Sequence, residues 1–402
     1  MVTLADVQAA RARIRDSIRI SPAAYSENLS RETDNAVLLK LENLHVTGSY
    51  KERGALNGML CMTEQQRANG VIAASAGNHA QGVAYHAGRL GIHATICMPL
   101  YTPLVKVTAT RGWGAEVVLH GENFDEALAE ARRRAITGGA TFLHAFDDPA
   151  VIAGQGTVGL ELLDQIPDLE AVVVPVGGGG LIGGLSCAIK ETRPEVRIVG
   201  VEPAALPSMK AALAAHQPVD VPAAPTIADG VAVRRVGDLT LELAEKYVDE
   251  MVTVDDEEIA MAILRLLEKQ KTLAEGAGAI GVAALLQKRT SLRGKRVAAV
   301  ITGGNIDVTL LAHIIERGLV KDGRSVRLRV TLADHPGGLE RLTGVISRGR
   351  ANILQVIHDR TYFGVHLGEA KIDITMETRG AEHAEELMHS LRDAGYRFER
   401  VL

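Results

Sequence analysis

A single lysine lies in a short glycine and serine turn of the sequence. Lys51 belongs to the stretch "TGSYKER", which follows the apolar run "VLLKLENL" and precedes the helical pattern "GALNGML". An isolated lysine is usually a solvated surface cation. A lysine amine held in a turn behind a buried strand can instead attack a carbonyl carbon or take a proton. Which of the two applies depends on the groups that the rest of the chain brings to the same place.

A run of glycines forms the strongest local signal for a ligand. The apolar stretch "VVVPV" continues into Gly177–Gly180, and a helical pattern follows. Backbone N–H groups of residues without side chains can close around an anion, and a helix N-terminus adds partial positive charge. These features predict a phosphate site. Because no Gly-Lys-Ser or Gly-Lys-Thr follows, the stretch is not a Walker nucleotide loop.

The same stretch also matches the dinucleotide-binding pattern G-x-G-x-x-G. Gly178, Gly180 and Gly183 occupy its glycine positions. Glu202 closes the next apolar run, where a dinucleotide-binding fold places the carboxylate that binds a ribose. An NAD-dependent oxidoreductase is therefore an alternative on this segment alone.

Two more apolar runs end in polar residues. "SAGNHAQG" follows "VIAA" and opens a helical pattern, so Ser75 and Asn78 could be helix N-caps. Alternatively, their side chains and the neighbouring N–H groups would bind a small carboxylate. His79 and His86 lie seven residues apart with no third ligand nearby, and we expect no metal there. In "ITGGN", Thr302 presents a single hydroxyl.

Together these segments supply one lysine, one phosphate-sized glycine loop, one carboxylate cradle and one lone hydroxyl. A cofactor with a phosphate, an aldehyde and a ring nitrogen would use all four, and pyridoxal phosphate is such a cofactor. Lys51 would then form a Schiff base with its aldehyde. A dinucleotide would use only the glycines.

The elements that must position these residues are visible in the hydrophobic pattern. From about residue 36 to 310, short apolar β-branched runs alternate with helical patterns, which predicts parallel strands buried on both faces, hence an α/β fold. Ligands of open α/β sheets bind at the carboxyl ends of the strands. The runs are "VIAAS", "ATICM", "AEVVLH", "AVVVPV", "VRIVGVE" and "VAAVIT".

The pattern changes near the end of the chain. The polar stretch "RGLVKDGRS" predicts a linker, and a strand, helix, strand, strand, helix, strand order follows over about 75 residues. That order predicts a small, separate α+β domain.

Composition excludes several classes of function. The chain has 402 residues and a net charge of -5, and no basic run with interleaved aromatics suggests nucleic acid. Cys61, Cys97 and Cys187 are scattered without paired spacing, which favours a reducing compartment and no zinc. The N-terminal stretch is a charged amphipathic helix rather than a signal peptide, and no apolar run could span a bilayer. We therefore expect a cytoplasmic enzyme.

The motifs also form a familiar series. "GSYKERGALN", "SAGNHAQGVA", "VPVGGGGLIGG", "TIADGVAV", "AEGAGA" and "TGGNID" resemble, in this order, the threonine dehydratases (threonine ammonia-lyases). These are fold-type II, tryptophan synthase β-like, pyridoxal-phosphate enzymes with a parallel-sheet core of two subdomains. The tail, through "DHPGGLERLTGVI", resembles a ferredoxin-like ACT domain, a module that binds amino acids and often pairs with a copy of itself. The resemblance implies a catalytic domain at 1–318 with a smaller subdomain at about 48–148, a linker at 319–325 and an ACT domain at 326–402.

The resemblance also implies roles for individual residues. Lys51 would be the Schiff-base lysine and the base, and Ser75 a second catalytic residue. Tyr50 would face the cofactor ring, Asn78 its phenolic oxygen and Thr302 its nitrogen, with Glu275 at its border. The remaining positions are the phosphate loop (Gly177, Gly178, Gly179, Gly180, Leu181) and the substrate-carboxylate loop (Ser75, Ala76, Gly77, Asn78, His79).

Two positions depart from the family pattern. Position 302 is Thr where Ser is commoner, a change that keeps the hydroxyl. Six residues beyond Glu202, where serine racemases and some relatives have an Asp as a metal ligand, this chain has Ser208. The second change puts a divalent-metal site in doubt and makes a serine racemase less favoured.

The activity that the resemblance implies is dehydration and deamination of L-threonine to 2-oxobutanoate and ammonia, with L-serine as a side substrate. The alternatives are dehydration of L-serine or 3-hydroxyaspartate, serine racemization, an NAD oxidoreductase, or an inactive amino-acid sensor. We expect a homodimer or homotetramer in isoleucine biosynthesis or threonine catabolism. An effector such as isoleucine or valine would bind Asp334, His335, Gly337 and Gly338; alternatively, the tail only dimerizes.

Overall fold

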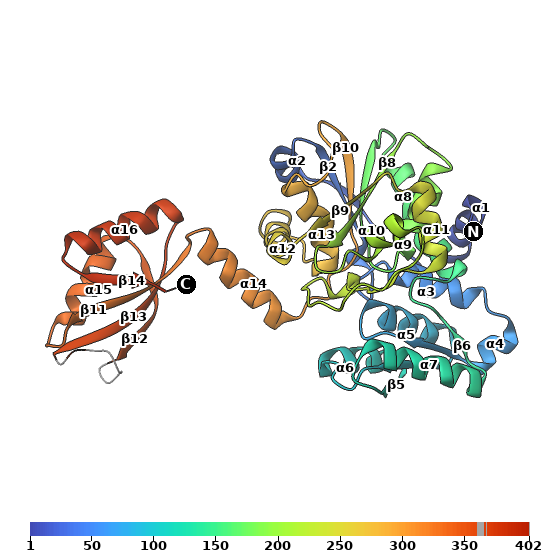
Figure 1. The fold of residues 1–402 in the computed structure, drawn as a ribbon, viewed down its shortest axis with the longest axis horizontal. Coiled ribbons are helices and arrows are strands. Elements are labelled where there is room, and N and C mark those ends of the chain that lie inside the picture. Colours follow the sequence, from blue (N-terminus) through green and yellow to red (C-terminus); the bar gives the residue numbers. More distant parts are fainter. Residues whose placement is uncertain (360–365, 367, 402) are drawn as a thin grey trace. The chain divides into compact units, whose positions relative to one another are not determined.

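The computed structural model describes residues 1–359, 366 and 368–401. The chain divides into two compact units, Met1–Ile306 and Asp307–Leu402 (Figure 1). Each unit has sheets of its own. Among the described residues, no helix combines the length and the apolar character that crossing a membrane requires.

A six-stranded sheet with the order β1-β2-β10-β7-β8-β9 organizes the first unit. All its pairs are parallel except that the short β1 runs antiparallel to β2. Every residue of β7 is buried, as its unbroken apolar sequence predicts for a strand covered on both faces. The strands are β1 Ala23–Tyr25, β2 Ala36–Leu41, β7 Ala171–Pro175, β8 Arg197–Pro203, β9 Glu250–Val254 and β10 Arg296–Ile301.

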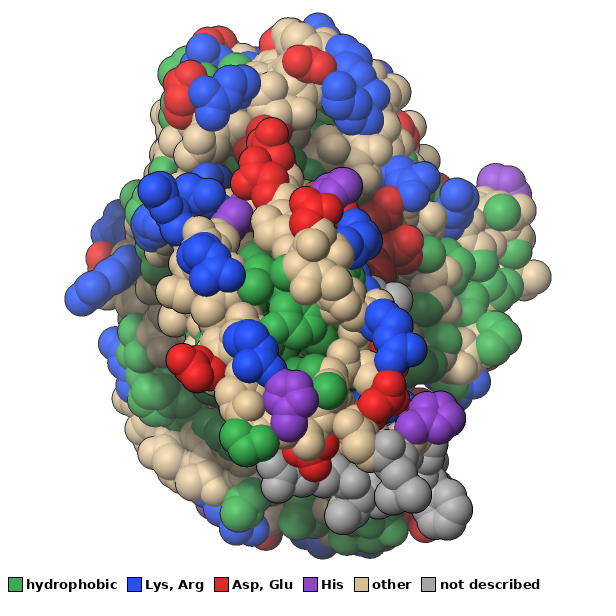
Figure 2. Space-filling view, turned by 90° about the vertical axis from the view of Figure 1, so that its left-hand side faces the viewer, with side chains coloured by type: hydrophobic (Ala, Val, Ile, Leu, Met, Phe, Trp, Pro, Cys, Tyr) green, Lys and Arg blue, Asp and Glu red, His purple; other side chains and the backbone are tan. Residues whose placement is uncertain are grey.

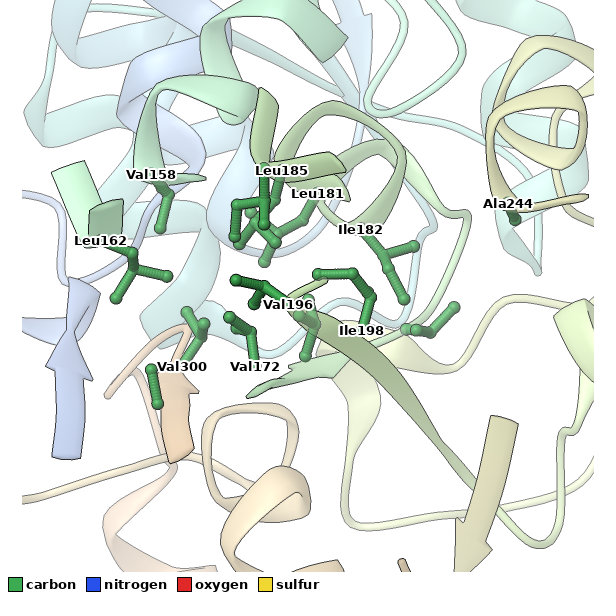
Figure 3. Packing of buried hydrophobic residues seen from close by; sticks show 14 of the residues in the cluster. Val158, Leu162, Val172, Leu181, Ile182, Leu185, Val196, Ile198, Ala244 and Val300 are labelled. Carbon is green, nitrogen blue, oxygen red and sulfur yellow. The ribbon is translucent and has the colours of Figure 1, made fainter. Parts of the chain in front are cut away.

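The main hydrophobic core lies on one face of this sheet (Figure 3). Val172 of β7 and Val300 of β10 belong to the same buried cluster as Leu162 of α8 (Pro149–Gln165) and Leu185 of α9 (Gly180–Lys190). On the opposite face, α13 (Gly276–Leu286) packs so closely that a Cβ on Gly281 would meet the Val173 side chain at 3.3 Å. The two helix layers fix the carboxyl ends of β7 and β10 beside each other.

A second, fully parallel sheet with the order β5-β4-β3-β6 lies within the range 48–148. Its faces alternate along β3: Ala73 packs with Val83 of α5 (Asn78–Leu90), whereas Ile72 packs with Ala131 of α7 (Phe124–Gly138). The strands are β3 Val71–Ala74, β4 Ala94–Met98, β5 Glu116–Leu119 and β6 Thr141–Phe142.

The other helices of the first unit are α1 Leu4–Ile14, α2 Glu27–Thr33, α3 Lys51–Leu60, α4 Glu64–Asn69, α6 Leu104–Gly112, α10 Ser208–Ala215, α11 Asp238–Tyr247 and α12 Asp256–Gln270, with 3-10 turns η1 Glu42–Leu44 and η2 Asp229–Val231. The six apolar runs singled out in the sequence all form strands. The predicted α/β class is confirmed.

The second unit carries the predicted βαββαβ order on an antiparallel sheet, β12-β13-β11-β14. β13 alternates buried and partly exposed residues, and the buried side packs against both helices, which lie on one face of the sheet (Figure 1). The elements are β11 Ser325–Ala333, α15 Gly338–Arg348, β12 Asn352–Asp359, β13 Glu369–Glu377, α16 Ala381–Asp393 and β14 Arg397–Arg400.

The stretch 319–325, expected to be a linker, is different in the structure. Helix α14 (Val308–Lys321) extends into it, and β11 begins at its last residue. The apolar residues of "VTLLAHIIERGLV" recur at helical spacing, and Asp307 caps the helix by accepting from Thr309 N and Leu310 N. The helix groups with the second unit, so the units divide after Ile306 rather than after residue 318.

Candidate active site

One cavity of about 330 Å³ in the first unit brings the sequence-predicted residues together. It opens where β7 and β10 end, at Pro175 and Thr302, and where β3 ends, at Ser75. The predicted residues that line it are Tyr50, Lys51, Ser75, Ala76, Gly77, Asn78, His79, Gly177, Gly178, Gly179, Gly180, Leu181, Glu275 and Thr302.

Lys51 is the first residue of α3, and its amine faces the cavity. The preceding turn needs Gly48, whose φ is +74° and whose added Cβ would lie 2.5 Å from Asn305 Oδ1. Nζ donates to the carbonyl of Ala145 at 2.9 Å. Burial lowers the pKa of Lys51 to about 8, although the nearby Glu275 carboxyl opposes the shift. A useful fraction of the amine is therefore neutral near neutral pH.

The glycine loop is shaped by close contact with Phe146. A Cβ on Gly180 would lie 2.8 Å from the carbonyl oxygen of Phe146, and one on Gly178 would overlap its ring at 2.3 Å. Gly179 has φ +92°, a left-handed conformation that glycine adopts without strain. The first N–H groups of α9 have no partner within the helix. The loop and the helix N-terminus together suit a phosphate.

The loop Ser75–His79 leads from β3 into α5, and the N-cap residue of that helix has no side chain to cap it. Gly77 holds the N-cap position, so the alternative that Ser75 or Asn78 is an N-cap is wrong. Asn78 instead donates from Nδ2 to Glu275 Oε1 at 2.6 Å and accepts from Asn305 Nδ2 at 2.8 Å. The first-turn N–H groups of α5 stay available for an anion.

Two buried titratable groups border the cavity. Burial first, and then Asp229, raises the pKa of Glu275 to about 7. Burial also lowers the pKa of His79 to about 3, so its ring is neutral. His79 Nε2 donates to the carbonyl of Leu143 at 3.1 Å, and its buried Nδ1 has no partner among the described residues.

A family model described as "Pyridoxal-phosphate dependent enzyme" matches residues 14–303. The chain belongs to this family. It is also 51% identical over 396 residues to an L-threonine ammonia-lyase of Thermotoga maritima, and the match covers 98% of each chain. The resemblance inferred from the motifs is thereby confirmed.

Solved structures of the same fold carry two different activities in their descriptions. The processed form of threonine deaminase isoform 2 from Solanum lycopersicum is 37% identical, with a TM-score of 0.74 over 78% of this chain and 86% of that one. A maize serine racemase is 31% identical, with a TM-score of 0.75 over 80% of this chain and 98% of that one. The fold alone therefore does not separate elimination from racemization.

The cavity of this pyridoxal-phosphate-dependent enzyme fits its cofactor. Lys51 can hold the aldehyde, and the loop of glycines can hold the phosphate, since it offers free N–H groups where any side chain would collide. Thr302 would face the ring nitrogen and Asn78 the phenolic oxygen. Both line the same cavity as the lysine.

Sequence reasoning missed several lining residues. Lys106 of α6 and Asp229 of η2 form an ion pair at 2.6 Å. Ala145 and Phe146 contribute a carbonyl and an aromatic wall. Asp229 lies in the motif "TIADG", which could have identified it, whereas nothing in the local sequence marks the other three.

Glu202, the residue that kept a dinucleotide site open, has another task in this enzyme. It is fully buried, and its carboxyl accepts from Met209 N at 2.6 Å and Lys210 N at 2.9 Å. Ser208 Oγ donates to it at 3.4 Å. Its oxygens thus cap α10 and are not free to bind a ribose. Among the described residues, no three His, Cys, Asp or Glu side chains gather as a metal would require.

Proposed function

We propose that this pyridoxal-phosphate-dependent enzyme is an L-threonine ammonia-lyase that converts L-threonine to 2-oxobutanoate and ammonia. One observation carries the proposal: the lysine, the glycine loop and the uncapped N-terminus of α5 face one cavity. The 51% identity to an L-threonine ammonia-lyase across 98% of both chains supports it.

The residues divide the work as follows. Bound pyridoxal phosphate makes the Cα proton of an amino acid acidic. Ser75 and the first N–H groups of α5 hold the substrate carboxylate. The Lys51 amine, with its pKa of about 8, takes the Cα proton as a general base. Thr302 would offer an uncharged hydroxyl to the ring nitrogen of the bound cofactor, which would limit negative charge in the ring and favour loss of the β-hydroxyl.

The test is release of 2-oxobutanoate from L-threonine by the purified protein with added pyridoxal phosphate. Lys51→Ala should abolish release, whereas Lys295→Ala, which removes an exposed ion pair with Glu170, should not. With L-serine as substrate instead, D-serine formation without keto acid would indicate a racemase. Turnover of 3-hydroxyaspartate but not threonine would contradict threonine as the substrate and leave the family assignment unchanged.

L-Serine is the proposed side substrate. It lacks one methyl group, and a pocket discriminates a methyl by only about 1–3 kcal/mol. 3-Hydroxyaspartate carries a β-carboxylate, which would need an unpaired cation in the cavity. Lys106 lines the cavity, but its charge is neutralized by Asp229. We therefore expect the order threonine, serine, 3-hydroxyaspartate in kcat/KM, measured with the same keto-acid assay.

A pocket of about 280 Å³ in the second unit supports the proposed amino-acid effector. His335 and Gly338 line it, as do Arg341 and Arg397; Asp334 and Gly337 adjoin it in sequence without lining it. Arg397 already pairs with Glu369 at 2.6 Å, so Arg341 is the better partner for a carboxylate. We propose isoleucine or valine as ligand. Titration calorimetry with both amino acids, repeated with Arg341→Ala, tests this.

We also propose that the enzyme is a homo-oligomer. β12 is an edge strand whose Leu354, Val356 and Ile357 are exposed, and such an edge favours pairing with a second copy. Sedimentation of wild type and Val356→Lys would distinguish a dimer or tetramer from a monomer.

A cytoplasmic location is part of the proposal, and the three cysteines are unpaired, as a reducing compartment requires. On the face in Figure 2, acidic and basic side chains are intermingled.

A further inference from the structure

The five residues Leu143–Asp147 contact both halves of the cofactor site. They lead from β6 to α8, and thus from the smaller sheet to the larger one. The carbonyl of Ala145 accepts from Lys51 Nζ at 2.9 Å. The next residue, Phe146, forms the wall against which Gly178 and Gly180 pack. One short segment therefore touches the reactive amine and the phosphate loop.

A histidine side chain within the segment fixes its turn. His144 Nδ1 accepts from Phe146 N at 3.3 Å and from Asp147 N at 2.8 Å. Both donors belong to the backbone, so the acceptor must be an unprotonated nitrogen. Burial, with smaller effects of Arg132 and Lys51, lowers the pKa of His144 to about 4 and keeps the ring neutral.

The far end of the segment is tied to the glycine loop by a second route. Asp147 Oδ1 accepts from Leu239 N at 3.1 Å, at the start of α11. In the same helix, Thr240 Oγ1 donates to the carbonyl of Gly178 at 2.7 Å. A change in the turn would therefore reach the phosphate loop through α11 as well as through Phe146.

We propose that His144 is a positioning residue: its Nδ1 holds the turn in which Ala145 orients the Lys51 amine and Phe146 supports the glycine loop. A backbone carbonyl does not titrate, so it can hold the amine whether or not Nζ carries an extra proton. Other groups near the amine act differently. The Tyr50 ring centroid lies 5.2 Å from Nζ, and Glu275 acts on Nζ through its charge. The inference rests on the family's cofactor and not on threonine as substrate.

The test uses three replacements of His144. Asn places an amide oxygen where Nδ1 lies, Gln moves its oxygen one bond further out, and Phe has no acceptor. The purified protein without cofactor is mixed with pyridoxal phosphate, and the visible absorbance of the lysine-bound cofactor gives the association rate and Kd. Exchange of the Phe146 and Asp147 amide protons reports the turn itself.

We expect His144→Asn to bind pyridoxal phosphate within about twofold of wild type, and His144→Gln and His144→Phe to bind about tenfold more slowly and weakly, as loss of one buried hydrogen-bond acceptor implies. His383→Phe is the matched control in the second unit. There, His383 Nδ1 also accepts from a backbone donor, Arg379 N, at 3.0 Å. Its replacement should leave cofactor binding unchanged.

Two results would overturn the proposal. One is wild-type cofactor binding by His144→Gln with rapid exchange of the two amides. The other is equal loss in His144→Asn and His144→Gln, since the acceptor would then not matter. If His144→Phe does not fold, the Asn and Gln pair decides. Normal cofactor binding by wild type without threonine turnover would count against the proposed function alone.

Discussion

Three helix N-termini in the first unit differ in what can accept hydrogen bonds from their first N–H groups. At α10, the buried Glu202 carboxyl accepts from two backbone N–H groups. At α5 and α9, the N-cap residues Gly77 and Gly179 have no side chain to accept from the helix, and both N-termini face the cavity. A helix end needs acceptors for its first N–H groups. The chain supplies its own acceptor at α10, and we propose that the substrate carboxylate and the cofactor phosphate supply the acceptors at the other two ends.

Glu202→Ala should have the largest effect on stability, because it removes the acceptor at the N-terminus of α10. It converts the satisfied end of α10 into an empty one that no ligand can reach, and leaving buried donors unpaired costs about 3 kcal/mol. We expect the free energy of unfolding in urea, measured at pH 6, to fall by that amount. Glu245→Ala is the control, because it removes a hydrogen bond between Glu245 of α11 and His216 at the other end of α10. Equal stability of the two variants would show that Glu202 is not needed as a cap.

Gly180→Ala should place a methyl group at the N-terminus of α9, where the phosphate is proposed to bind. The added Cβ would lie 2.8 Å from the Phe146 carbonyl, and overpacking of this kind costs about 1–3 kcal/mol, so we expect a loss of about ten- to a hundredfold in pyridoxal phosphate affinity. Gly112→Ala, in a helix with nothing within 4 Å of the new Cβ, should bind normally. Fluorescence titration with the cofactor measures both. Unchanged affinity in Gly180→Ala would remove the steric argument for the glycine loop.

Gly77→Asp should give α5 the cap that it lacks. A Cβ at Gly77 meets nothing within 4 Å, so the side chain can be accommodated, and an N-cap stabilizes a helix by about 1 kcal/mol. The same carboxylate would compete with substrate for the N–H groups. We therefore expect higher thermal stability together with a KM for threonine raised about tenfold, an effect typical of one charge-assisted hydrogen bond. Gly77→Ala, without an acceptor, should leave KM near wild type; a rise in KM there would point to sterics instead.

The sequence predicted the turns and strand ends that line the cavity better than it predicted the hydrogen bonds of Ala145 and Glu202. Glycine runs and polar residues directly after apolar runs are local signals, and parallel strands bring their carboxyl ends to one edge of a sheet. Lys51, Gly177–Gly180 and Thr302 could therefore be grouped from the sequence alone. Ala145 contributes only a carbonyl, which any residue has. The capping role of Glu202 depends on how α10 folds back, and local sequence cannot report it.

Helix α14 shows the same limitation at the level of domains. Its amphipathic pattern was visible, but the polar "VKDGRS" that follows also suits a linker. Packing of α14 against β11 decides the grouping, and that contact depends on tertiary structure.

Glu275→Gln tests a second buried carboxyl group, which borders the cavity and caps no helix end as Glu202 does. The pKa of Glu275 is raised from 4.5 to about 7, so its stabilizing contribution is complete below pH 4.5 and is lost as pH rises through 7. A neutral Gln keeps the oxygen that accepts from Asn78 and avoids this loss. In the protein without cofactor, we expect nearly equal unfolding free energies at pH 4.5 and an advantage of at most about 3 kcal/mol for the variant at pH 8. A variant that is less stable at pH 8 would mean that the ionized carboxylate is favoured there, and that its attraction to the Lys51 amine outweighs its burial.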